Sequence, residues 1–475
     1  MDNAFLSKGV TVKKGQEIVL TIDRMKYPNV GIGIFEEQEV RVKNVLKGQT
    51  LSCRISKKRS GKVEARPLEI IERAPNEQAS FCEHFDKCGG CMLQTLNYEN
   101  QLATKMDMVK NLFDEAGMML NFNEIVPSPE AFEYRNKMEF SFGDEFKDGP
   151  LTLGMHKKGH HHDVIDVPFC HLIDADYRTI LTGILEYAKE NQLIKYNKRS
   201  NIGFLRHLVV RKSKATSEIM IALSATTQVA DHEGRPFDTA AFKNHILSLP
   251  LSGKVASLLY VHNDGLGDMV TGEIECLHGN DYIIEKLFGL SFKITLYSFF
   301  QTNSQGAEIL YKTALDLIPE IEGKICFDLF SGTGTIGQIM AGRAKKVIGI
   351  EWVADAVEAA KENAKMNQLD NCEFICGDVF QKLSELKDHP DVIVVDPPRS
   401  GMGDKTTRAI AAYEVPEIVY VSCNPSTLLE DLMVFKQCGY ETDAITLVDM
   451  FPWTAGVETV VLLSHKKSQA SSPSL

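Results

Sequence analysis

The hydrophobic and polar positions of the chain follow a different pattern in each of three regions. In residues 1–75, short runs such as EIVLTIDRM and QEVRVKNV alternate apolar with polar residues, and Gly, Asn and Lys turns separate them. Short strands at this spacing predict a small β-barrel of the OB type, and an SH3-like barrel would give a similar pattern. The segment RAPNEQAS that follows is typical of a linker.

The second region, residues 76–290, mixes helical and strand patterns. A helical pattern runs from about Tyr98 to Ala116, and strand patterns follow in NKMEFSFG, HLVVRK and EIMIALSAT. This order predicts an α+β domain in the middle of the chain. We expect the helix at about residues 95–117 to pack on the domain that follows.

The third region, residues 291–466, alternates strands with helices. Strand patterns in KICFDLF, KKVIGIE, DVIVVDPP and IVYVSC are separated by helical patterns such as WVADAVEAAKENAKMN. This alternation indicates a parallel sheet with helices on both faces. The predicted fold class is therefore α/β, with a doubly wound, Rossmann-like domain at the C-terminus. Residues 467–475 carry no such pattern and are predicted to be disordered.

Composition narrows the class of protein. The chain of 475 residues is 44% hydrophobic and 24% charged, as an ordinary globular protein is. No run approaches the ~18 apolar residues of a membrane helix, and the start, MDNAFLSKGV, lacks the features of a secretion signal. The 11 cysteines stand at irregular spacing, which favours a reducing compartment in which thiols serve metals or chemistry. We therefore expect a cytoplasmic protein without membrane contact.

Charge is distributed unevenly between the regions. The net charge is -12, but residues 1–73 carry 15 Lys or Arg against 9 Asp or Glu, which is +6 and leaves -18 for the rest. A basic domain on an acidic body suits local contact with phosphates. A solvated charged face would give the same balance, so charge alone leaves both interpretations open.

A glycine-rich segment opens the third region. FDLFSGTGTIG places Gly332, Gly334 and Gly337 in a G-x-G-x-x-G pattern between a predicted strand and a predicted helix. Glycines there let the backbone approach a ligand closely, and Glu351 at the end of the next strand could accept hydrogen bonds from ribose hydroxyls. The pattern indicates an adenosine-type cofactor, either NAD(P) or S-adenosylmethionine, and a purely structural turn is the third reading.

Three aspartates favour S-adenosylmethionine over a dinucleotide. Asp328 ends the strand before the glycine loop, where a carboxylate could meet a methionine ammonium group. Asp378 follows the third strand, where it could reach adenine. Asp396 begins the motif DPPR, in which a carboxylate and rigid prolines could form the rim of a pocket for a planar base.

Cys423 is the candidate nucleophile. In PEIVYVSCNPSTLLED, an apolar strand delivers this residue to an Asn-Pro corner, at the edge of the sheet where ligands bind in open α/β folds. An isolated cysteine is most often buried and inert. The glycine loop, DPPR and SCNP follow one another within about ninety residues, however, and this combination favours a reactive thiol.

A thiol beside a methyl donor suggests one particular reaction. C5 of a pyrimidine is a poor nucleophile, and addition of a thiolate to C6 loads electron density onto C5. After methyl transfer a base must remove the C5 proton so that the thiolate can leave. Glu458, in DMFPWTAGVETVVLL, is the candidate for this base, and a surface carboxylate is the alternative.

The motifs SFFQTN, FDLFSGTGTIG, DPPRSG, YVSCNPSTLLED and DMFPWTAGVETV together resemble the S-adenosylmethionine-dependent RNA 5-methyluridine methyltransferases. The resemblance covers nearly the whole chain. It implies Cys423 as nucleophile, Glu458 as base and Asp396 as a residue that also holds the uracil. The residues that it implies around the cofactor, beside Asp328, Gly332 and Gly334, are Gln301, Phe330, Thr335, Glu351, Asp378 and Asp396. The family commonly has His two residues before the final Glu, where this chain has Gly456.

Four cysteines outside the third region form a candidate metal site. Cys82, Cys88 and Cys91 are spaced C-x5-C-x2-C, and Cys170 stands far along the chain. Four thiolates can hold zinc or a [4Fe–4S] cluster, and zinc ribbons usually have two short-spaced pairs where this chain has one. The segment CGGCMLQTLNYENQLATK resembles the iron–sulfur segment of the same family, which implies a [4Fe–4S] cluster. Radical S-adenosylmethionine enzymes use a different cysteine spacing.

The resemblance implies methylation of uridine C5 in RNA. The first region resembles a TRAM domain, and within the family a TRAM domain and a cysteine cluster accompany action on large-subunit ribosomal RNA. We therefore expect 23S rRNA as substrate, with tRNA as the alternative, no DNA partner and a monomer. Two other classes remain as rivals: an NAD(P)-dependent iron–sulfur oxidoreductase and a non-catalytic iron–sulfur RNA-binding protein.

One strand pattern in the middle region has two interpretations. FLRHLVVRK alternates basic with apolar residues and contains Arg206, His207 and Arg211. A strand that faces RNA would have this pattern, and so would an ordinary exposed strand.

Overall fold

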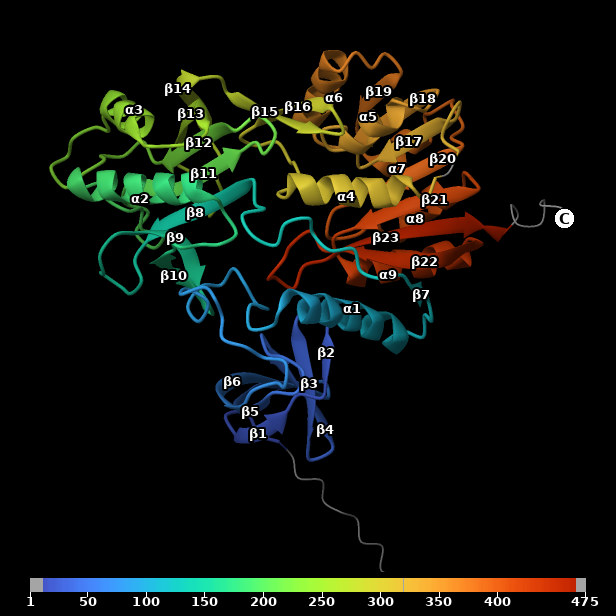
Figure 1. Ribbon diagram of the computed structural model, residues 1–475, viewed down its shortest axis with the longest axis horizontal. Helices are drawn as coiled ribbons and strands as arrows, with labels where there is room; N and C mark the ends of the chain where they lie inside the picture. Colours follow the sequence, from blue (N-terminus) through green and yellow to red (C-terminus); the bar gives the residue numbers. More distant parts are fainter. Residues whose placement is uncertain (1–11, 319, 467–475) are drawn as a thin grey trace, which may run out of the picture.

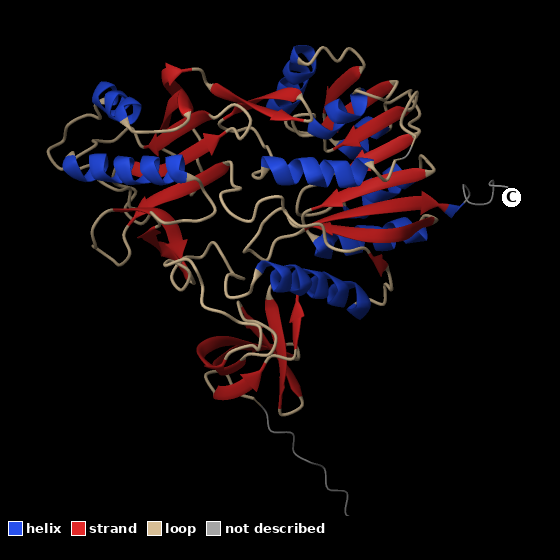
Figure 2. Ribbon diagram, viewed as in Figure 1, coloured by secondary structure: helices blue, strands red, loops and turns tan. Residues whose placement is uncertain are grey.

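The structure of the protein is a computed structural model that describes residues 12–318 and 320–466. The predicted disordered tail at 467–475 lies outside the described residues. Three larger sheets, one in each region of the chain, form separate parts of the molecule, and helices pack on their faces and between them (Figures 1 and 2). Within the described residues, none of the helices is long and apolar enough to cross a membrane.

The N-terminal sheet contains six strands in the order β1-β5-β6-β4-β3-β2. Their bounds are Glu17–Thr21 (β1), Arg24–Lys26 (β2), Val30–Phe35 (β3), Gln38–Lys43 (β4), Thr50–Arg59 (β5) and Lys62–Glu72 (β6). The run EIVLTIDRM, predicted as one strand, is divided: β1 pairs with β5 and β2 pairs with β3. The chain thereby passes from one edge of the sheet to the other, and alternate side chains enter a shared core that includes Ile18, Leu20, Val40 and Val42.

The middle sheet has seven strands in the order β10-β9-β8-β11-β12-β13-β14. Their bounds are Lys137–Gly143 (β8), Thr152–Lys157 (β9), His160–Asp166 (β10), Leu205–Lys212 (β11), Glu218–Ala225 (β12), Lys254–His262 (β13) and Glu273–Gly279 (β14). Helices α2 (Ala175–Glu190) and α3 (Thr239–Ser248) share a core with one face of the sheet. β11 and β12 are buried along almost their whole length, because other elements cover the second face as well.

The RNA-facing interpretation of FLRHLVVRK is wrong for its basic side chains. Arg206, His207 and Arg211 lie on β11 and are each only 3% exposed. Arg206 donates to the Asn263 carbonyl (2.9 Å) and Arg211 to the Leu296 carbonyl (3.1 Å). These cations satisfy buried backbone carbonyls, and the strand is neither exposed nor free to contact RNA.

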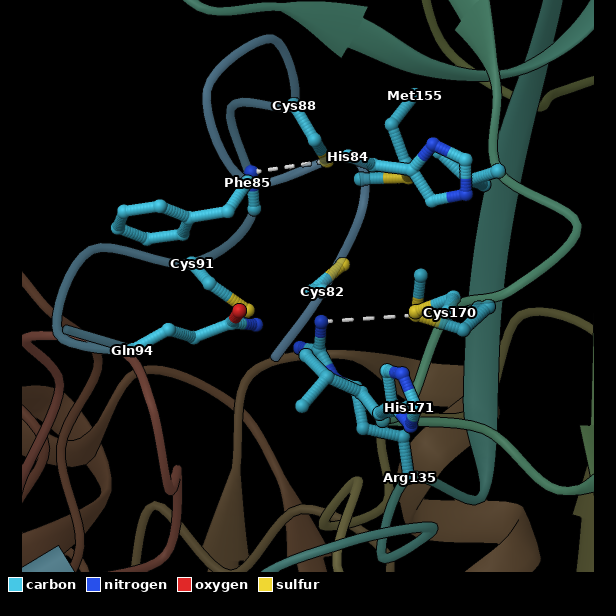
Figure 3. A pocket seen from close by; sticks show the side chains of 14 residues that line it. Cys82, His84, Phe85, Cys88, Cys91, Gln94, Arg135, Met155, Cys170 and His171 are labelled. Carbon is cyan, nitrogen blue, oxygen red and sulfur yellow. Dashed lines mark hydrogen bonds between the residues drawn. The ribbon is translucent and has the colours of Figure 1, made fainter. Parts of the chain in front are cut away.

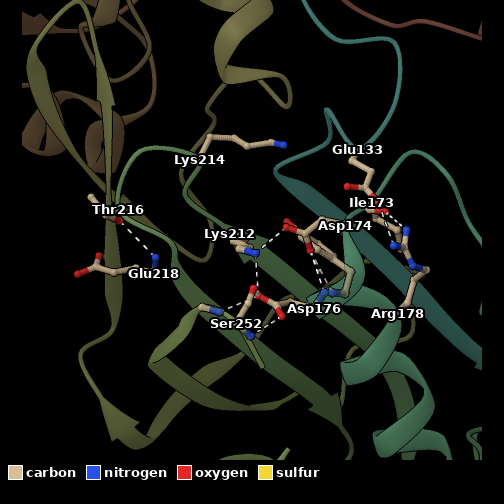
Figure 4. Close-up of polar contacts among 12 residues, drawn as sticks. Glu133, Ile173, Asp174, Asp176, Arg178, Lys212, Lys214, Thr216, Glu218 and Ser252 are labelled. Carbon is tan, nitrogen blue, oxygen red and sulfur yellow. Dashed lines mark hydrogen bonds and ion pairs between the residues drawn. The ribbon is translucent and has the colours of Figure 1, made fainter. Parts of the chain in front are cut away.

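A buried ion-pair cluster fixes α2 on this sheet (Figure 4). Lys212, at the end of β11, donates to Asp174 Oδ2 (2.6 Å) and to Asp176 Oδ2 (2.7 Å) at the start of α2. Asp176 also accepts hydrogen bonds from the backbone N–H groups of Ser252 (2.7 Å) and Gly253 (2.9 Å). These contacts lower the pKa of Asp176 to about 2 against the effect of burial. The cluster is structural, since every carboxylate oxygen involved faces a donor.

The third sheet has the order β19-β18-β17-β20-β21-β23-β22-β7. Its strands are β7 (Asn121–Phe122), β17 (Ile325–Leu329), β18 (Lys346–Glu351), β19 (Cys372–Cys376), β20 (Val392–Val395), β21 (Glu417–Ser422), β22 (Tyr440–Val448) and β23 (Glu458–His465). Its helices are α4 (Ser304–Leu315), α5 (Thr335–Ala341), α6 (Ala354–Met366), α7 (Val379–Leu383), α8 (Gly403–Ala411) and α9 (Pro425–Gln437). β17 to β21 are parallel and β23 is antiparallel to β21. The doubly wound sheet predicted from the alternation of strands and helices is present.

Four elements cross the predicted boundaries between regions or make contacts beyond them. Helix α1 (Tyr98–Glu115) contributes Val109 and Phe113 to the core of the third sheet, and β7 pairs with β22. The hairpin of β15 (Tyr282–Leu287) and β16 (Leu290–Thr295) spans the predicted boundary at residue 290. The middle region and the third sheet therefore share hydrophobic core.

Candidate active site

The predicted catalytic residues lie together at the edge of the third sheet where its parallel strands end. Asp396 directly follows β20, and Cys423 directly follows β21. Because β23 is antiparallel to β21, its first residue, Glu458, lies at the same edge. Ser422 pairs with Thr459, whose hydroxyl donates to the Ser422 carbonyl (3.0 Å). Cys423 and Glu458 are the next residues outward on the two strands, so their side chains flank one site.

A glycine-rich turn joins β17 to α5 at this edge. Gly332 and Gly334 have φ angles of 53° and 74°, in the left-handed region that favours glycine. A Cβ atom on Gly334 would lie 2.5 Å from Cζ of Phe374, so a side chain there would displace the ring. Glu351 ends β18, and its carboxylate accepts hydrogen bonds from the N–H groups of Gly332 (3.0 Å) and Val353 (2.9 Å). The turn lies between a strand and a helix, as the G-x-G-x-x-G pattern predicts, and Glu351 is hydrogen-bonded to it.

Asp328 lies next to this turn in β17 and is fully buried. Its Oδ2 accepts a hydrogen bond from the Gly337 N–H (2.7 Å), whereas its Oδ1 has no partner within the described residues. Burial raises the pKa of this carboxyl group to about 7, and the Glu351 charge adds to the rise. A buried acceptor without a donor favours a ligand that supplies one. An ammonium group would meet this requirement.

Two further acids of the site have raised pKa values. Burial, reinforced by Asp328, raises the pKa of Asp396 to about 7. Burial, reinforced by Asp396 and opposed by Arg399, raises the pKa of Glu458 to about 8. Neighbouring acids at a buried edge cannot all ionise at neutral pH. The site therefore retains protons that a bound cation would displace.

The thiol of Cys423 is half-buried and belongs to the same electrostatic group. Burial, with contributions from Glu458 and Asp396, raises its pKa to about 11, and Arg399 opposes this rise as a charge and as a hydrogen-bond partner. The thiol is consequently protonated at neutral pH before substrate binds. Since the thiolate is the nucleophilic form, reaction needs a proton acceptor, and Glu458 and Asp396 are the carboxyl groups that act on the thiol.

The other residues predicted to bind a cofactor lie at the ends of neighbouring elements. Phe330 follows β17 with φ 65°, and Thr335 begins α5. Asp378 caps α7 by accepting a hydrogen bond from the Gln381 N–H (3.1 Å). Gln301 is buried just before α4. The structure thus brings the predicted set to one edge of the sheet.

Sequence reasoning missed two residues of the site. Tyr311 is buried in α4, hydrogen-bonds Gln301, and has its pKa raised by burial and by Asp396 and Glu458. A tyrosine in an apolar helical pattern resembles an ordinary core residue, so no signal marked it. Arg399 did carry a signal, because it is the one cation of the DPPR motif, yet its action on the thiol depends on the fold.

The loop before Glu458 is held by a buried ion pair. Lys105 of α1 donates to Asp449 Oδ1 (2.6 Å) and to the Phe451 carbonyl (3.0 Å), and both charged side chains are 0% exposed. Gly456, which replaces the histidine common in the resembled family, lies in this loop. Helix α1, which is not part of the third sheet, therefore holds in place the loop that leads to Glu458.

Trp453 connects the same loop to the segment that carries the cysteines. Its carbonyl accepts hydrogen bonds from the N–H groups of Met92 (2.9 Å) and Leu93 (3.0 Å), directly after the C-x2-C pair. Its indole N–H donates to the Ala131 carbonyl (2.5 Å), and Phe132 stacks on the ring with centroids 5.1 Å apart. The loop that leads to Glu458 is thus in direct contact with the cysteine segment.

The four cysteines predicted to hold a metal line one cavity (Figure 3). Cys82, Cys88 and Cys91 come from the loop before α1, and Cys170 comes from the loop before α2. The Gly90 N–H donates to Cys88 Sγ (3.4 Å). Within the described residues, no group of three or more His, Cys, Asp or Glu side chains has the arrangement of a metal site. The structure brings the four predicted cysteines together around one cavity.

Comparison with known proteins agrees with this site. A family model described as tRNA (Uracil-5-)-methyltransferase matches residues 274–466. A protein of Clostridium acetobutylicum named as an RNA methyltransferase is 44% identical over 457 residues, 96% of this chain and 99% of that protein. One from Bacteroides thetaiotaomicron with the same description is 34% identical and covers 88% of this chain and 95% of its own length.

A solved structure has a similar fold over most of this chain. It is the Pyrococcus abyssi tRNA (uracil-54, C5)-methyltransferase in complex with S-adenosyl-L-homocysteine, 27% identical, with a TM-score of 0.73 over 94% of this chain and 99% of that one. The fold and the site therefore define an S-adenosylmethionine-dependent RNA methyltransferase. The chain belongs to the RNA (uracil-5-)-methyltransferase family, and the NAD(P)-dependent and non-catalytic alternatives do not fit this membership.

The raised pKa of Glu458 predicts how stability changes in a Glu458→Gln variant. The folded pKa of about 8 exceeds the ordinary value of 4.5, so the folded protein binds more protons than the unfolded chain between these pH values. The carboxyl group therefore does not lower the free energy of unfolding below pH ~4.5. Above that pH it lowers this free energy increasingly, and the effect reaches its full size above pH ~8. Glutamine carries no charge, so the variant should gain stability over wild type progressively, by ~1 kcal/mol or more at pH 8.5.

Thermal or urea unfolding at pH 5.5, 7.0 and 8.5 measures this gain. Glu69→Gln, at an exposed position on β6, is the matched control and should give a difference from wild type that does not change with pH. A Glu458→Gln difference that stays constant across the three pH values would contradict the raised pKa.

Proposed function

We propose that this enzyme methylates C5 of a uridine in RNA through a covalent adduct on Cys423. Asp396 takes the proton of the Cys423 thiol, the thiolate adds to C6, the electron pair that accumulates at C5 attacks the methyl group, and S-adenosylhomocysteine leaves. Glu458 then removes the C5 proton, and the C6–S bond breaks to release the thiolate. The observation that carries this proposal is the pairing of β21 with β23, which sets Cys423 and Glu458 side by side.

The charges of the site support this order of events. Arg399 favours the thiolate of Cys423, and Glu458, with a pKa of about 8, is a base of suitable strength at the pH of a cell. Asp396 has a pKa of about 7 and could either donate to or accept from the polar edge of uracil. The target base has to leave its stack to reach these groups, which costs a few kcal/mol.

The cofactor would lie along the ends of β17, β18 and β19. Glu351 would accept from the ribose hydroxyls and Asp378 would reach adenine. Asp328 Oδ1, which has no partner among the residues that the structure describes, would accept from the methionine ammonium group. The backbone of Gly332 and Gly334, with Gln301, Phe330, Thr335 and Asp396, would complete the binding site. The methyl group of the cofactor and the uracil ring that receives it would then meet at the end of β20.

The N-terminal sheet is proposed as a TRAM-like RNA-binding barrel of the OB type. Lys57, Lys58 and Arg59 are exposed at the end of β5, and phosphates would bind such a cluster at low sequence specificity. We propose 23S rRNA as the substrate, because this sheet and the four cysteines accompany that activity in the resembled family. A second candidate is tRNA, favoured by the likeness to the Pyrococcus abyssi tRNA enzyme. We further propose a monomer that acts in the cytoplasm.

The four cysteines are proposed to hold a [4Fe–4S] cluster. The residues around the cavity fit such a cluster. Four thiols line it, Met138, Met155 and Leu172 make part of the lining apolar, and a backbone N–H donates to Cys88 Sγ. Zinc is the alternative.

Cys91→Ser should lower the amount of iron bound per chain, because one of the four thiols is lost. Plasma mass spectrometry and the visible absorption of the cluster measure this loss. Cys376→Ser, at an exposed site, is the control and should not lower the iron content. Zinc instead of iron in the wild-type protein would overturn this assignment.

Replacement of Cys423 tests the covalent mechanism. RNA that contains 5-fluorouridine has no C5 proton to lose, so the wild-type enzyme should remain attached to it in the presence of S-adenosylmethionine. Cys423→Ala should abolish the attached species on a denaturing gel and lower methyl transfer by at least ~10³-fold, since the nucleophile is lost. Cys438→Ala, on a half-buried cysteine after α9, is the control and should retain the adduct.

The same experiment distinguishes the substrates. With 5-fluorouridine in fragments of 23S rRNA and in tRNA transcripts, the adduct should form on rRNA. An adduct that persists in Cys423→Ala would contradict the nucleophile, and an adduct on tRNA alone would replace the first substrate by the second.

A further inference from the structure

One hairpin of the N-terminal sheet reaches the catalytic region. The strands β2 and β3 extend toward α1, whereas β1 and the β3–β4 turn lie away from it (Figure 1). Arg24 and Lys26 of β2 form ion pairs with Glu115 of α1. Asn111 of α1 donates to the Met25 carbonyl (3.1 Å). The hairpin is therefore fastened to the helix that also holds the loop before Glu458.

Tyr27 stands at the turn of this hairpin, directly after β2. Its half-buried side chain packs against the core of the N-terminal sheet and also against the core of the third sheet. The next turn residue, Asn29, is buried, and its N–H donates to Met108 Sδ of α1 (3.3 Å). The ring of Tyr27 thus lies between two domains in a position fixed from both sides.

The phenol of Tyr27, which packs against the core of the third sheet, interacts electrostatically with three groups of the site. Burial raises its pKa to about 12, Glu458 and Cys423 add to the rise, and Arg399 opposes it. A carboxyl group, a thiol and a guanidinium of the catalytic site therefore all act on this hydroxyl. At the pH of a cell the phenol keeps its proton and is a hydrogen-bond donor.

A donor at this position meets a chemical need of the reaction. When a thiolate adds to C6, negative charge develops on the carbonyl oxygen of uracil that is conjugated with C5. Asp396 and Glu458 are acids that repel this charge once ionised. A fixed O–H donor aimed at a developing oxyanion stabilises the transition state more than the ground state.

We propose that Tyr27, supplied by the N-terminal sheet, forms part of the uracil pocket and donates a hydrogen bond to the extruded base. The inference rests on the proposed covalent methylation of uridine. It gives the N-terminal sheet a role in the chemical step, in addition to the phosphate contacts proposed for Lys57, Lys58 and Arg59. The active site is then complete only when the hairpin is docked on α1.

The test compares Tyr27→Phe with wild type, because phenylalanine keeps the ring and its packing and removes only the hydroxyl. Single-turnover methyl transfer is measured at saturating RNA, together with the rate of adduct formation on 5-fluorouridine RNA. Tyr27→Phe should slow both by ~10-fold or more, the effect of removing one donor to developing charge. Its affinity for S-adenosylhomocysteine and its melting temperature should equal those of wild type.

Two further variants separate the possible roles. Tyr27→Ala should slow the reaction at least as much as Tyr27→Phe and also lower the melting temperature, since the ring that packs against both cores is lost. Lys57→Ala should raise the RNA concentration needed for half-saturation, because a proposed phosphate contact is lost. A Tyr27→Phe enzyme with wild-type rates would overturn the inference, because packing alone would then explain the residue. A wild-type enzyme that forms no adduct would overturn the covalent mechanism itself.

Discussion

The site depends on the burial of several acids at one edge of a sheet. Asp328, Asp396 and Glu458 have pKa values raised to about 7, 7 and 8, and the thiol of Cys423 lies among them with a pKa of about 11. Such a group is unfavourable when fully ionised and becomes favourable when a cation enters. A sulfonium methyl donor brings that cation to the place where the methyl group is used. The buried acids then explain both why the free site retains protons and why the site binds the sulfonium methyl donor.

The topology of the third sheet explains why these acids meet. Parallel strands all end at one edge, so residues that directly follow β17, β20 and β21 converge although they are far apart in the chain. The antiparallel β23 adds its first residue, Glu458, to the same edge. Support comes from outside the sheet: the Lys105–Asp449 ion pair and the contacts of Trp453 hold the loop that leads to Glu458. This support surrounds Gly456, the position at which the resembled family commonly has histidine.

Local sequence pattern predicted the parts of the molecule that depend on neighbours in the chain. Alternation of strands and helices predicted the doubly wound sheet, and the residues at strand ends, such as Cys423, predicted the edge at which they meet. Pattern could not predict contacts between distant segments. Lys105 would be expected in solvent on an amphipathic helix, yet it is paired with Asp449, and Arg206 was interpreted as exposed but satisfies buried carbonyls. Tyr27 had no signal at all, because its place in the site follows from how the N-terminal sheet docks on α1.

The central claim is that the acids of the free site hold protons that a sulfonium displaces. Calorimetry at pH 7 in buffers of different ionisation enthalpy measures the protons released when S-adenosylmethionine and S-adenosylhomocysteine bind, and these ligands differ in the sulfonium charge. The account predicts that S-adenosylmethionine releases more protons, and that its affinity relative to S-adenosylhomocysteine increases from pH 6 to pH 8. Equal proton release by both ligands, with a ratio of affinities independent of pH, would contradict it.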